Sequence, residues 1–366
     1  REALRQRVHR LESELGLVAA FAFDSPEEAR EHEYLVTLES DLVAARAEGG
    51  LLRRMRQALA TAQQSERDLV EFRGAWERVR EEVKASYPLY ADLDLEPQDG
   101  LVPLGRDADS GLQMFWHVAS GARPEVHGGK VSMQADSGLV FVLAPPGTFA
   151  MGMKDHYTIH PVTLDAFFVS KFEATQGQWA RLGGGRPSMI SSGTLVEKVD
   201  ITDLHPVESV SCLDAQSVLR SHGLDLPTEA QWEYVARAGT RTETWLGTAD
   251  DMVALLDEAT QKNGNVWVHM PVDSIRPNPW GLYYVLGNLA EMCRDHNISY
   301  DVAEHSPGDG LLMSFLSYDC ASRGGSLADG RESYRIGRRF WHIQYLATPL
   351  HGIRPVRSLG KGSPLR

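Results

Sequence analysis

The chain has 366 residues, of which 42% are hydrophobic and 24% are charged. This composition is that of a globular protein with one large or two to three ordinary domains, and it excludes wholesale disorder. No apolar run approaches the roughly 18 residues of a membrane-spanning helix, and the longest, residues 15–23, follows acidic residues instead of the basic flank of a secretory signal. The net charge of −13 argues against nucleic acid as the main partner.

Cysteine and arginine usage adds two expectations. The three cysteines, at 212, 293 and 320, are widely spaced and odd in number. They fit neither a disulfide framework nor a thiolate zinc site, so a reducing, cytoplasmic location is expected. Residues 323–366 hold nine Lys and Arg against two acidic residues. Because arginine makes planar, bidentate contacts readily, we expect these arginines to pair internally with carboxylates.

Residues 1–90 are predicted to be helical. Apolar residues recur every three or four positions in two stretches, which places each set on one face of a helix. Ser25 and Pro26 form a helix start between them, because serine caps the first turn and proline has no N–H to lose there. We expect a separable helical hairpin or bundle whose apolar faces are complete before Pro88, with an oligomerising coiled coil as the alternative. The two sets are Leu4, Val8, Leu11 and Leu15, then Leu69, Phe72, Trp76, Val79 and Val83.

The sequence after Pro88 is rich in Pro, Gly and Asp and contains short apolar runs. Residues 91–137 are predicted to be a linker with lead-in strands. Residues 138–360 are predicted to form an α+β domain with a small antiparallel sheet, in which residues 139–143 form a strand. Three helices are expected to open at Thr175, Ser211 and Thr228 and to end near Gly183, Gly223 and Gly239.

Eight short phrases follow one another in a recognisable order. They are GTFAMG, FEAT, PVESVS, LPTEAQWEY, GLY, GNLAE, RGGS and GIRPVR, at residues 147–152, 172–175, 206–211, 226–234, 281–283, 287–291, 323–326 and 352–357. Together they resemble the formylglycine-generating enzyme, or sulfatase-modifying factor, superfamily. The resemblance implies a C-type-lectin-like fold of irregular loops on a small sheet. Residues 100–128 are similar to the lead-in of such domains that follow an upstream protein kinase, so a kinase neighbour is one expected partner.

The resemblance also indicates which chemistry is lost. The active enzymes of this superfamily oxidise a substrate cysteine with copper held by two cysteines shortly after the RGGS phrase. Here Asp329 and Tyr334 stand at those places, and no cysteine follows Ser326. Because soft thiolates select Cu(I), this chain is not expected to generate formylglycine. The iron site of a second enzymatic branch needs glutamate two residues after its second histidine, where this chain has Val162 after His160.

A calcium site is a weaker implication of the resemblance. The family holds calcium partly through the segment that matches the backbone carbonyls of Gly287 and Leu289 and the side chain of Glu291. A preceding Asn or Asp ligand is replaced by Tyr284, which removes a hard oxygen from the cage. The alternative is that Glu291 accepts hydrogen bonds from an arginine, with Arg323 as the candidate.

Residues 340–351 are dense in large amphipathic side chains, and neither a period of 2 nor one of 3.6 sorts them into two sides. Their framework resembles that of the variable proteins of diversity-generating retroelements, in which spaced arginines stay fixed while residues between them vary. This resemblance makes Arg323, Arg335, Arg339 and Arg354 structural. It also implies that the ligand is bound by the residues between these arginines, which are Ala328, Asp329, Phe340, Trp341, His342, Ile343, Tyr345, Leu346, Thr348 and Leu350. The alternative is a packed core, with Ile343 and Leu346 inward.

The sequence therefore predicts a non-catalytic ligand-binding, or display, protein. Its C-terminal face, within residues 323–357, would recognise a protein or another macromolecule, because aromatic side chains dominate interface hot spots. No cofactor is expected apart from the weak calcium candidate. The alternative function is an enzyme or regulator in cysteine or sulfur oxidation that uses a metal site not recognised in the sequence.

Overall fold

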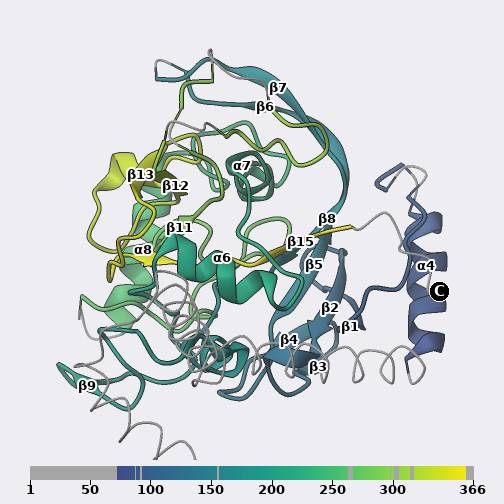
Figure 1. Ribbon diagram of the computed structural model, residues 1–366, viewed down its shortest axis with the longest axis horizontal. Coiled ribbons are helices and arrows are strands. Elements are labelled where there is room, and N and C mark those ends of the chain that lie inside the picture. The colour runs from purple at the N-terminus through teal and green to yellow at the C-terminus, as the bar shows by residue number, and fades with distance from the viewer. Residues whose placement is uncertain are drawn as a thin grey trace, which may run out of the picture. The chain divides into compact units, whose positions relative to one another are not determined.

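The computed structural model describes residues 72–86, 88–90, 93–154, 156–262, 267–296, 298–300, 305–313 and 317–359. All of them belong to one compact unit, residues 58–366 (Figure 1). The helical periodicity predicted before residue 72, including the start at Ser25 and Pro26, lies outside the described residues.

The largest sheet has five strands in the order β1-β2-β5-β8-β15, and every neighbouring pair is antiparallel. Its centre is built from continuous apolar runs, which is the pattern of strands covered on both faces. The strand predicted at residues 139–143 is confirmed one residue later, and it ends where Pro145 and Pro146 cannot donate to a ladder. The strands are β1 (Leu101–Arg106), β2 (Gln113–His117), β5 (Val140–Ala144), β8 (Phe167–Ser170) and β15 (Val356–Ser358).

A second sheet has four strands in the order β13-β12-β11-β14, with β11 and β14 parallel. Three separate hairpins complete the strands. The second sheet consists of β11 (Ala290–Met292), β12 (Asp319–Arg323), β13 (Phe340–Ile343) and β14 (His351–Gly352), and the hairpins pair β3 (Glu125–His127) with β4 (Lys130–Ser132), β6 (Gly147–Met151) with β7 (His160–Leu164), and β9 (Leu195–Val196) with β10 (Val199–Asp200).

The helices largely follow the predicted capping signals. Thr175 and Thr228 each form a complete capping box, and Ser211 caps through the backbone N–H of Asp214. The three helices end at Trp179, Arg220 and Arg237, each before its predicted glycine. The last one stops where Ala238 takes the left-handed conformation. The helices are α4 (Arg73–Ala85), α5 (Gln176–Trp179), α6 (Cys212–Arg220), α7 (Glu229–Arg237) and α8 (Ala249–Lys262), with short turns η1 (Val118–Ser120), η2 (Ala180–Gly184) and η3 (Arg331–Tyr334).

Helix α4 confirms the predicted spacing, because Trp76, Val79 and Val83 are its buried residues. They do not complete a core of their own. The Trp76 ring lies 5.2 Å from the ring of Phe115 on β2, and α4 packs against β1 at the edge of the large sheet (Figure 1). The expectation that the helical apolar faces are complete before Pro88 is therefore wrong for α4, since its stripe is covered by the sheet.

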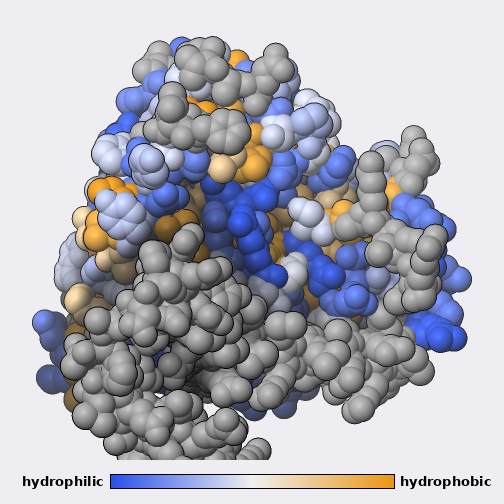
Figure 2. Space-filling view, viewed as in Figure 1, coloured by the Kyte–Doolittle hydropathy of each residue, from blue (hydrophilic) through white to orange (hydrophobic). Residues whose placement is uncertain are grey.

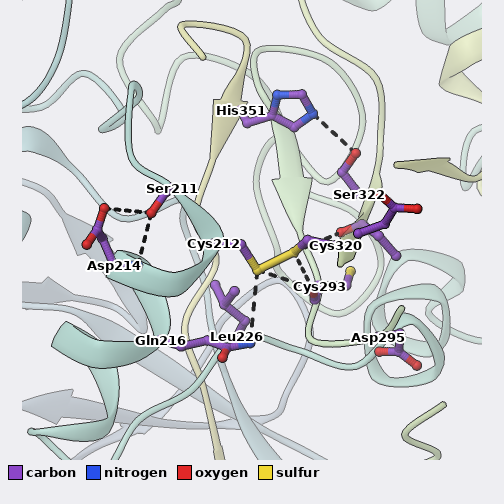
Figure 3. The surroundings of a disulfide bond; sticks show 12 residues. Ser211, Cys212, Asp214, Gln216, Leu226, Cys293, Asp295, Cys320, Ser322 and His351 are labelled. Atoms are coloured by element: carbon purple, nitrogen blue, oxygen red, sulfur yellow. Dashed lines mark hydrogen bonds between the residues drawn. A yellow bond between two sulfur atoms is a disulfide. The ribbon is translucent and has the colours of Figure 1, made fainter. Parts of the chain in front are cut away.

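Two cysteines contradict the expectation drawn from their spacing. Cys212 at the start of α6 and Cys320 on β12 form a disulfide across 108 residues (Figure 3). Cys293 is the remaining thiol and is buried beside the bond, where burial raises its pKa. Spacing failed here because α6 and β12 meet only in the folded chain. None of the helices in the described part of the chain has the length and apolar character that crossing a bilayer requires.

Candidate functional site

The predicted ligand-binding stretch begins as a strand. β13 pairs with β12, so that Trp341 lies opposite Ala321 and Ile343 opposite Asp319. Side chains alternate along a strand, and Trp341 and Ile343 accordingly point outward while His342 points inward. A strand of four residues is too short for this period to be recognised in the sequence.

The exposed residues after β13 extend this outward side. Trp341 is 59% exposed and Tyr345 67% exposed. We name Trp341, Ile343, Tyr345, Leu346 and Leu350 the β13 surface; all five are exposed. Figure 2, which is coloured by residue hydropathy, shows orange and pale residues on the side of the molecule where Figure 1 labels β13. The exposure of Ile343 and Leu346 contradicts the alternative that they pack inward.

The other five predicted ligand-binding residues are not alike. Ala328 and Asp329 are exposed in the loop after β12, and Phe340 and Thr348 are half-buried. His342 is buried, at 7% exposure, and its ring lies against that of His351 with centroids 4.3 Å apart and the planes tilted by 33°. Its assignment to an exposed face is wrong, because it occupies the inward position of β13. Burial lowers the pKa of His342 to about 4.

Sequence reasoning missed one neighbour of the β13 surface. Tyr318 is 72% exposed, and its carbonyl accepts a hydrogen bond from the backbone N–H of Gln344 at 3.1 Å. It therefore lies beside the residues that follow β13. The available signal was an aromatic residue directly before a strand that pairs with the candidate stretch.

A cluster of buried charges holds the ends of the C-terminal segment. α7 supplies Glu229 and Glu233, one helical turn apart and fully buried. Arg323 forms ion pairs with both, and Arg339 binds Glu229 through Nε at 2.9 Å and Nη2 at 2.5 Å. Because buried charges persist only when paired and hydrogen-bonded, this cluster fixes β12 and the start of β13 against α7.

Arg354 forms the second buried pair. Its Nε and Nη2 bind both carboxylate oxygens of Glu291, and its remaining N–H groups donate to the carbonyls of Ser170 and Tyr283. The indole of Trp232 donates to the same carboxylate at 2.6 Å. Glu291 is thus an acceptor for an arginine, as the alternative to calcium predicted, but the partner is Arg354 and not Arg323.

The calcium candidates share this neighbourhood. The backbone N–H of Gly287 donates to Gly324, and that of Leu289 donates to the buried carboxylate of Glu173. Burial beside Glu291 raises the pKa of Glu173 well above its ordinary value. The described residues contain no group of three or more His, Cys, Asp and Glu arranged to hold a metal ion. Calcium at Glu291 stays a prediction, with Arg354 as the competing cation.

Arg335 differs from the other three structural arginines. Its side chain is 21% exposed and pairs with Glu332 at 3.1 Å and Glu243 at 3.4 Å, both of which are exposed. The expectation of a buried internal pair is therefore wrong for this position, because Arg335 follows η3 at the surface and pairs with exposed glutamates.

The loop after the RGGS phrase is closed by the two residues that stand at the copper positions. Asp329 Oδ2 accepts hydrogen bonds from the backbone N–H and the hydroxyl of Ser326, both at 2.7 Å. The Tyr334 hydroxyl donates to the carbonyls of Ser326 and Asp329 at 3.1 Å, and burial raises its pKa to about 12. Gly324 is needed here because a Cβ would meet the Val285 carbonyl at 2.9 Å.

A cavity of about 230 Å³ adjoins this loop. We name it the α8 cavity, since α8 forms one wall and packs against η3. Sequence reasoning missed α8, although Thr248 and Asp251 exchange N-terminal capping hydrogen bonds. Apolar residues at helical spacing, such as Val253 and Leu256, were the other available signal.

The fold and the buried arginine–glutamate pairs define a C-type-lectin-like domain of the formylglycine-generating-enzyme type. The sulfatase-modifying factor enzyme 1-like domain matches residues 129–359, and the chain belongs to this family. The predicted fold class, with its small antiparallel sheets, is confirmed.

Related proteins agree with this assignment. The chain is 36% identical over 144 residues to a formylglycine-generating enzyme of Streptomyces coelicolor, covering 31% of this chain and 43% of the relative. It is 30% identical over 188 residues to serine/threonine-protein kinase pkn1 of Chlamydia pneumoniae, covering 45% of this chain and 29% of the kinase. The chain therefore spans less than half the length of these two relatives.

Solved structures share the fold. Variable protein 1 of Treponema denticola superposes with a TM-score of 0.52 at 20% identity, over 64% of this chain and 98% of that protein. PvdO from Pseudomonas aeruginosa gives a TM-score of 0.51 at 21% identity, over 65% of this chain and all of that protein.

Proposed function

We propose that this chain is a non-catalytic ligand-binding protein that recognises a protein or another macromolecule through the β13 surface. The observation that supports this most is that the C-terminal segment buries its charged residues and exposes its aromatic ones. Arg323, Arg339 and Arg354 are buried in ion pairs, whereas Trp341 and Tyr345 are exposed. Exposed aromatic side chains on a rigid frame offer large contact area at low entropic cost.

The non-catalytic part of the proposal depends on Asp329 and Tyr334. Both are occupied in closing their own loop, and neither supplies the soft thiolate that selects Cu(I). The alternative, an enzyme or regulator of cysteine oxidation, is favoured by the likeness to a formylglycine-generating enzyme. Copper-dependent oxidation of a cysteine-containing peptide by the purified chain would support that alternative.

Three further proposals accompany this function. Diversification of the C-terminal segment by a retroelement would leave a near-repeat of the 3′ end of the gene and a reverse transcriptase beside it. An upstream kinase domain is supported by the match to a protein kinase. Oligomerisation through the N-terminal helices completes the set. The cytoplasmic location predicted from the cysteine spacing is opposed by the Cys212–Cys320 disulfide, since disulfides are rare in reducing compartments.

The function is tested with a surface double variant, Trp341→Ala with Tyr345→Ala. The matched control is Met189→Ala with Leu195→Ala, which removes two exposed side chains that lie outside the C-terminal segment. Partners captured from the source cells by the wild type are purified, and their affinities for the three proteins are compared. The double variant should bind about thirtyfold more weakly or worse, because hot-spot truncation costs about 2 kcal/mol or more. Equal affinity of all three proteins for every partner would contradict the proposal.

A further inference from the structure

Two histidines from distant parts of the chain meet at their ring nitrogens. His160 is the first residue of β7, and His305 is the first of the described residues 305–313. Their Nε2 atoms lie 2.9 Å apart, which is a hydrogen-bond distance. The ring centroids are 5.0 Å apart and the planes differ by 18°. Because the centroids are separated by about one ring diameter more than the nitrogens, the rings lie end to end, as a hydrogen bond between them requires.

The other nitrogen of each ring faces a backbone carbonyl. His160 Nδ1 lies 2.9 Å from the carbonyl oxygen of Thr158, and His305 Nδ1 lies 2.7 Å from that of Gly310. A carbonyl oxygen only accepts hydrogen bonds, so each Nδ1 carries a proton. Turning either ring over would place carbon atoms at both of its contacts, so the network also assigns the two ring orientations.

These three contacts need one proton more than two neutral rings hold. A neutral imidazole has a single N–H, and in each ring Nδ1 already uses it. Both Nε2 atoms would then face each other as acceptors with no proton between them. One additional proton on either Nε2 completes all three hydrogen bonds, and it gives the pair a single positive charge.

The nearest charges do not decide whether the pair holds that proton. Glu229 raises the pKa of His305 and Arg339 lowers it, and these two residues are bound to each other. Their effects therefore oppose each other at the pair, and the hydrogen-bond requirement decides. The other titratable or charged groups of the neighbouring elements are His156 and Tyr157 between β6 and β7, Glu233 and Arg323, which form an ion pair, and Asp309, which pairs with Arg294.

The two rings differ in their surroundings. Burial lowers the pKa of His305, and the adjoining His160 lowers it further, although the bond to Gly310 raises it. His305 is therefore the ring that stays neutral and accepts. His160 lies against the ring of Tyr300 with centroids 4.9 Å apart, and aromatic rings attract cations. His160 is thus the better place for the positive charge.

We propose that His160 and His305 share one proton at neutral pH, with His160 as the donor, and that this proton clamps β7 to residues 305–310. The clamp opens as the pH rises, because loss of the proton leaves two acceptors facing each other. Tyr300 packs against both rings, and the Arg339 guanidinium lies 4.2 Å from its centroid, so the clamp adjoins the anchor of β13. This inference goes beyond the proposed function and does not depend on it.

The first test counts the protons on the rings. Long-range ¹H–¹⁵N correlations of the imidazole nitrogens are recorded on the full, ¹⁵N-labelled chain at pH 7.5, with EDTA present to keep metal ions away. An ordinary histidine is about one-tenth protonated at this pH. His160 should instead show two protonated nitrogens, and His305 a protonated Nδ1 with a bare Nε2. The variants His160→Gln and His305→Gln assign the signals by their absence.

The second test follows stability with pH. The folded pair holds its proton more tightly than the unfolded chain does, so stability falls as the pH rises through the range where the folded pair loses it. Between pH 7 and 8.5 the folding equilibrium constant of the wild type should fall about threefold more than that of His305→Gln. The matched control is His127→Gln, a change of an exposed histidine on β3, which should follow the wild type.

Two outcomes would overturn the inference: two neutral rings at pH 7.5, or a wild-type pH profile equal to that of His305→Gln. The ring-proton count is made on the wild-type chain, and His160→Gln alone assigns one ring, so the test stands even if His305→Gln does not fold. Neither outcome bears on the β13 surface, whose test uses partner affinity.

Discussion

Two parts of the same C-terminal segment have opposite environments. Arg323, Arg339 and Arg354 are long, charged side chains, yet all three are buried, while Trp341 and Tyr345 are large and aromatic and exposed. Charged residues are seldom fully buried unless paired, and each of the three arginines has a glutamate partner. The difference separates a frame that determines stability from a surface that is free to determine binding.

Substitutions in the frame of buried arginines should lower the free energy of unfolding most. Arg354→Ala leaves Glu291 charged and unpaired in the interior, so the free energy of unfolding should fall by about 3–5 kcal/mol. Urea denaturation measures it. The paired change Arg354→Met with Glu291→Leu removes both charges and should recover part of the loss. A single variant as stable as the wild type would show that the arginine cluster does not hold the fold.

Breaking the disulfide should cause the second-largest loss of stability. Cys212 and Cys320 close a loop of 108 residues, and breaking such a link removes a restraint on the unfolded chain worth about 2–4 kcal/mol. Reductant should lower the urea midpoint of the wild type and leave Cys212→Ser with Cys320→Ser unaffected. Counting thiols in the denatured protein provides the check, since three reactive thiols without reductant would show that the bond is absent.

The inward position of β13 predicts sensitivity to acid. The pKa of His342 is lowered to about 4 in the folded chain, below its unfolded value near 6.5, so its contribution to stability is present above pH 6.5 and lost as the pH falls toward 4. Between pH 6.5 and 5 this loss is about 2 kcal/mol. His342→Gln should therefore show a shallower decline over that interval. Identical pH profiles would place the ring in water instead.

Arg335 should matter much less than the buried arginines. Because its pairs with Glu332 and Glu243 are exposed to solvent, Arg335→Ala should cost no more than about 1 kcal/mol. Thermal melts of Arg335→Ala and Arg354→Ala, measured side by side, compare the two losses of stability. A loss equal to that of Arg354→Ala would mean that Arg335 belongs to the buried frame after all.

Local signals in the sequence predicted the local structure well. The spacing of Trp76, Val79 and Val83 predicted α4, and the threonine and glutamine of each capping box predicted the starts of α5 and α7. The ordered phrases predicted the fold, because their glycines, arginines and glutamates are the residues that the buried pairs and tight turns require.

Features that depend on distant partners could not be predicted in this way. Glu291 lies directly opposite Arg323 on paired strands, yet its carboxylate binds Arg354. The side chain of Arg323 binds Glu229 and Glu233 of α7 instead. The Cys212–Cys320 bond and the burial of His342 likewise follow from the meeting of α6, β12 and β13. The α8 cavity was not predicted because α8, which forms one wall, was not predicted, although Thr248 and Asp251 carry its capping signal.

The central claim concerns the β13 surface and is tested most directly by the unfolding free energies of Trp341→Ala and Tyr345→Ala. Exposed side chains away from the core contribute little, so each variant should lie within about 1 kcal/mol of the wild type. Loss of about 3–5 kcal/mol in both, the cost of removing a large aromatic from a packed interior, would contradict the account.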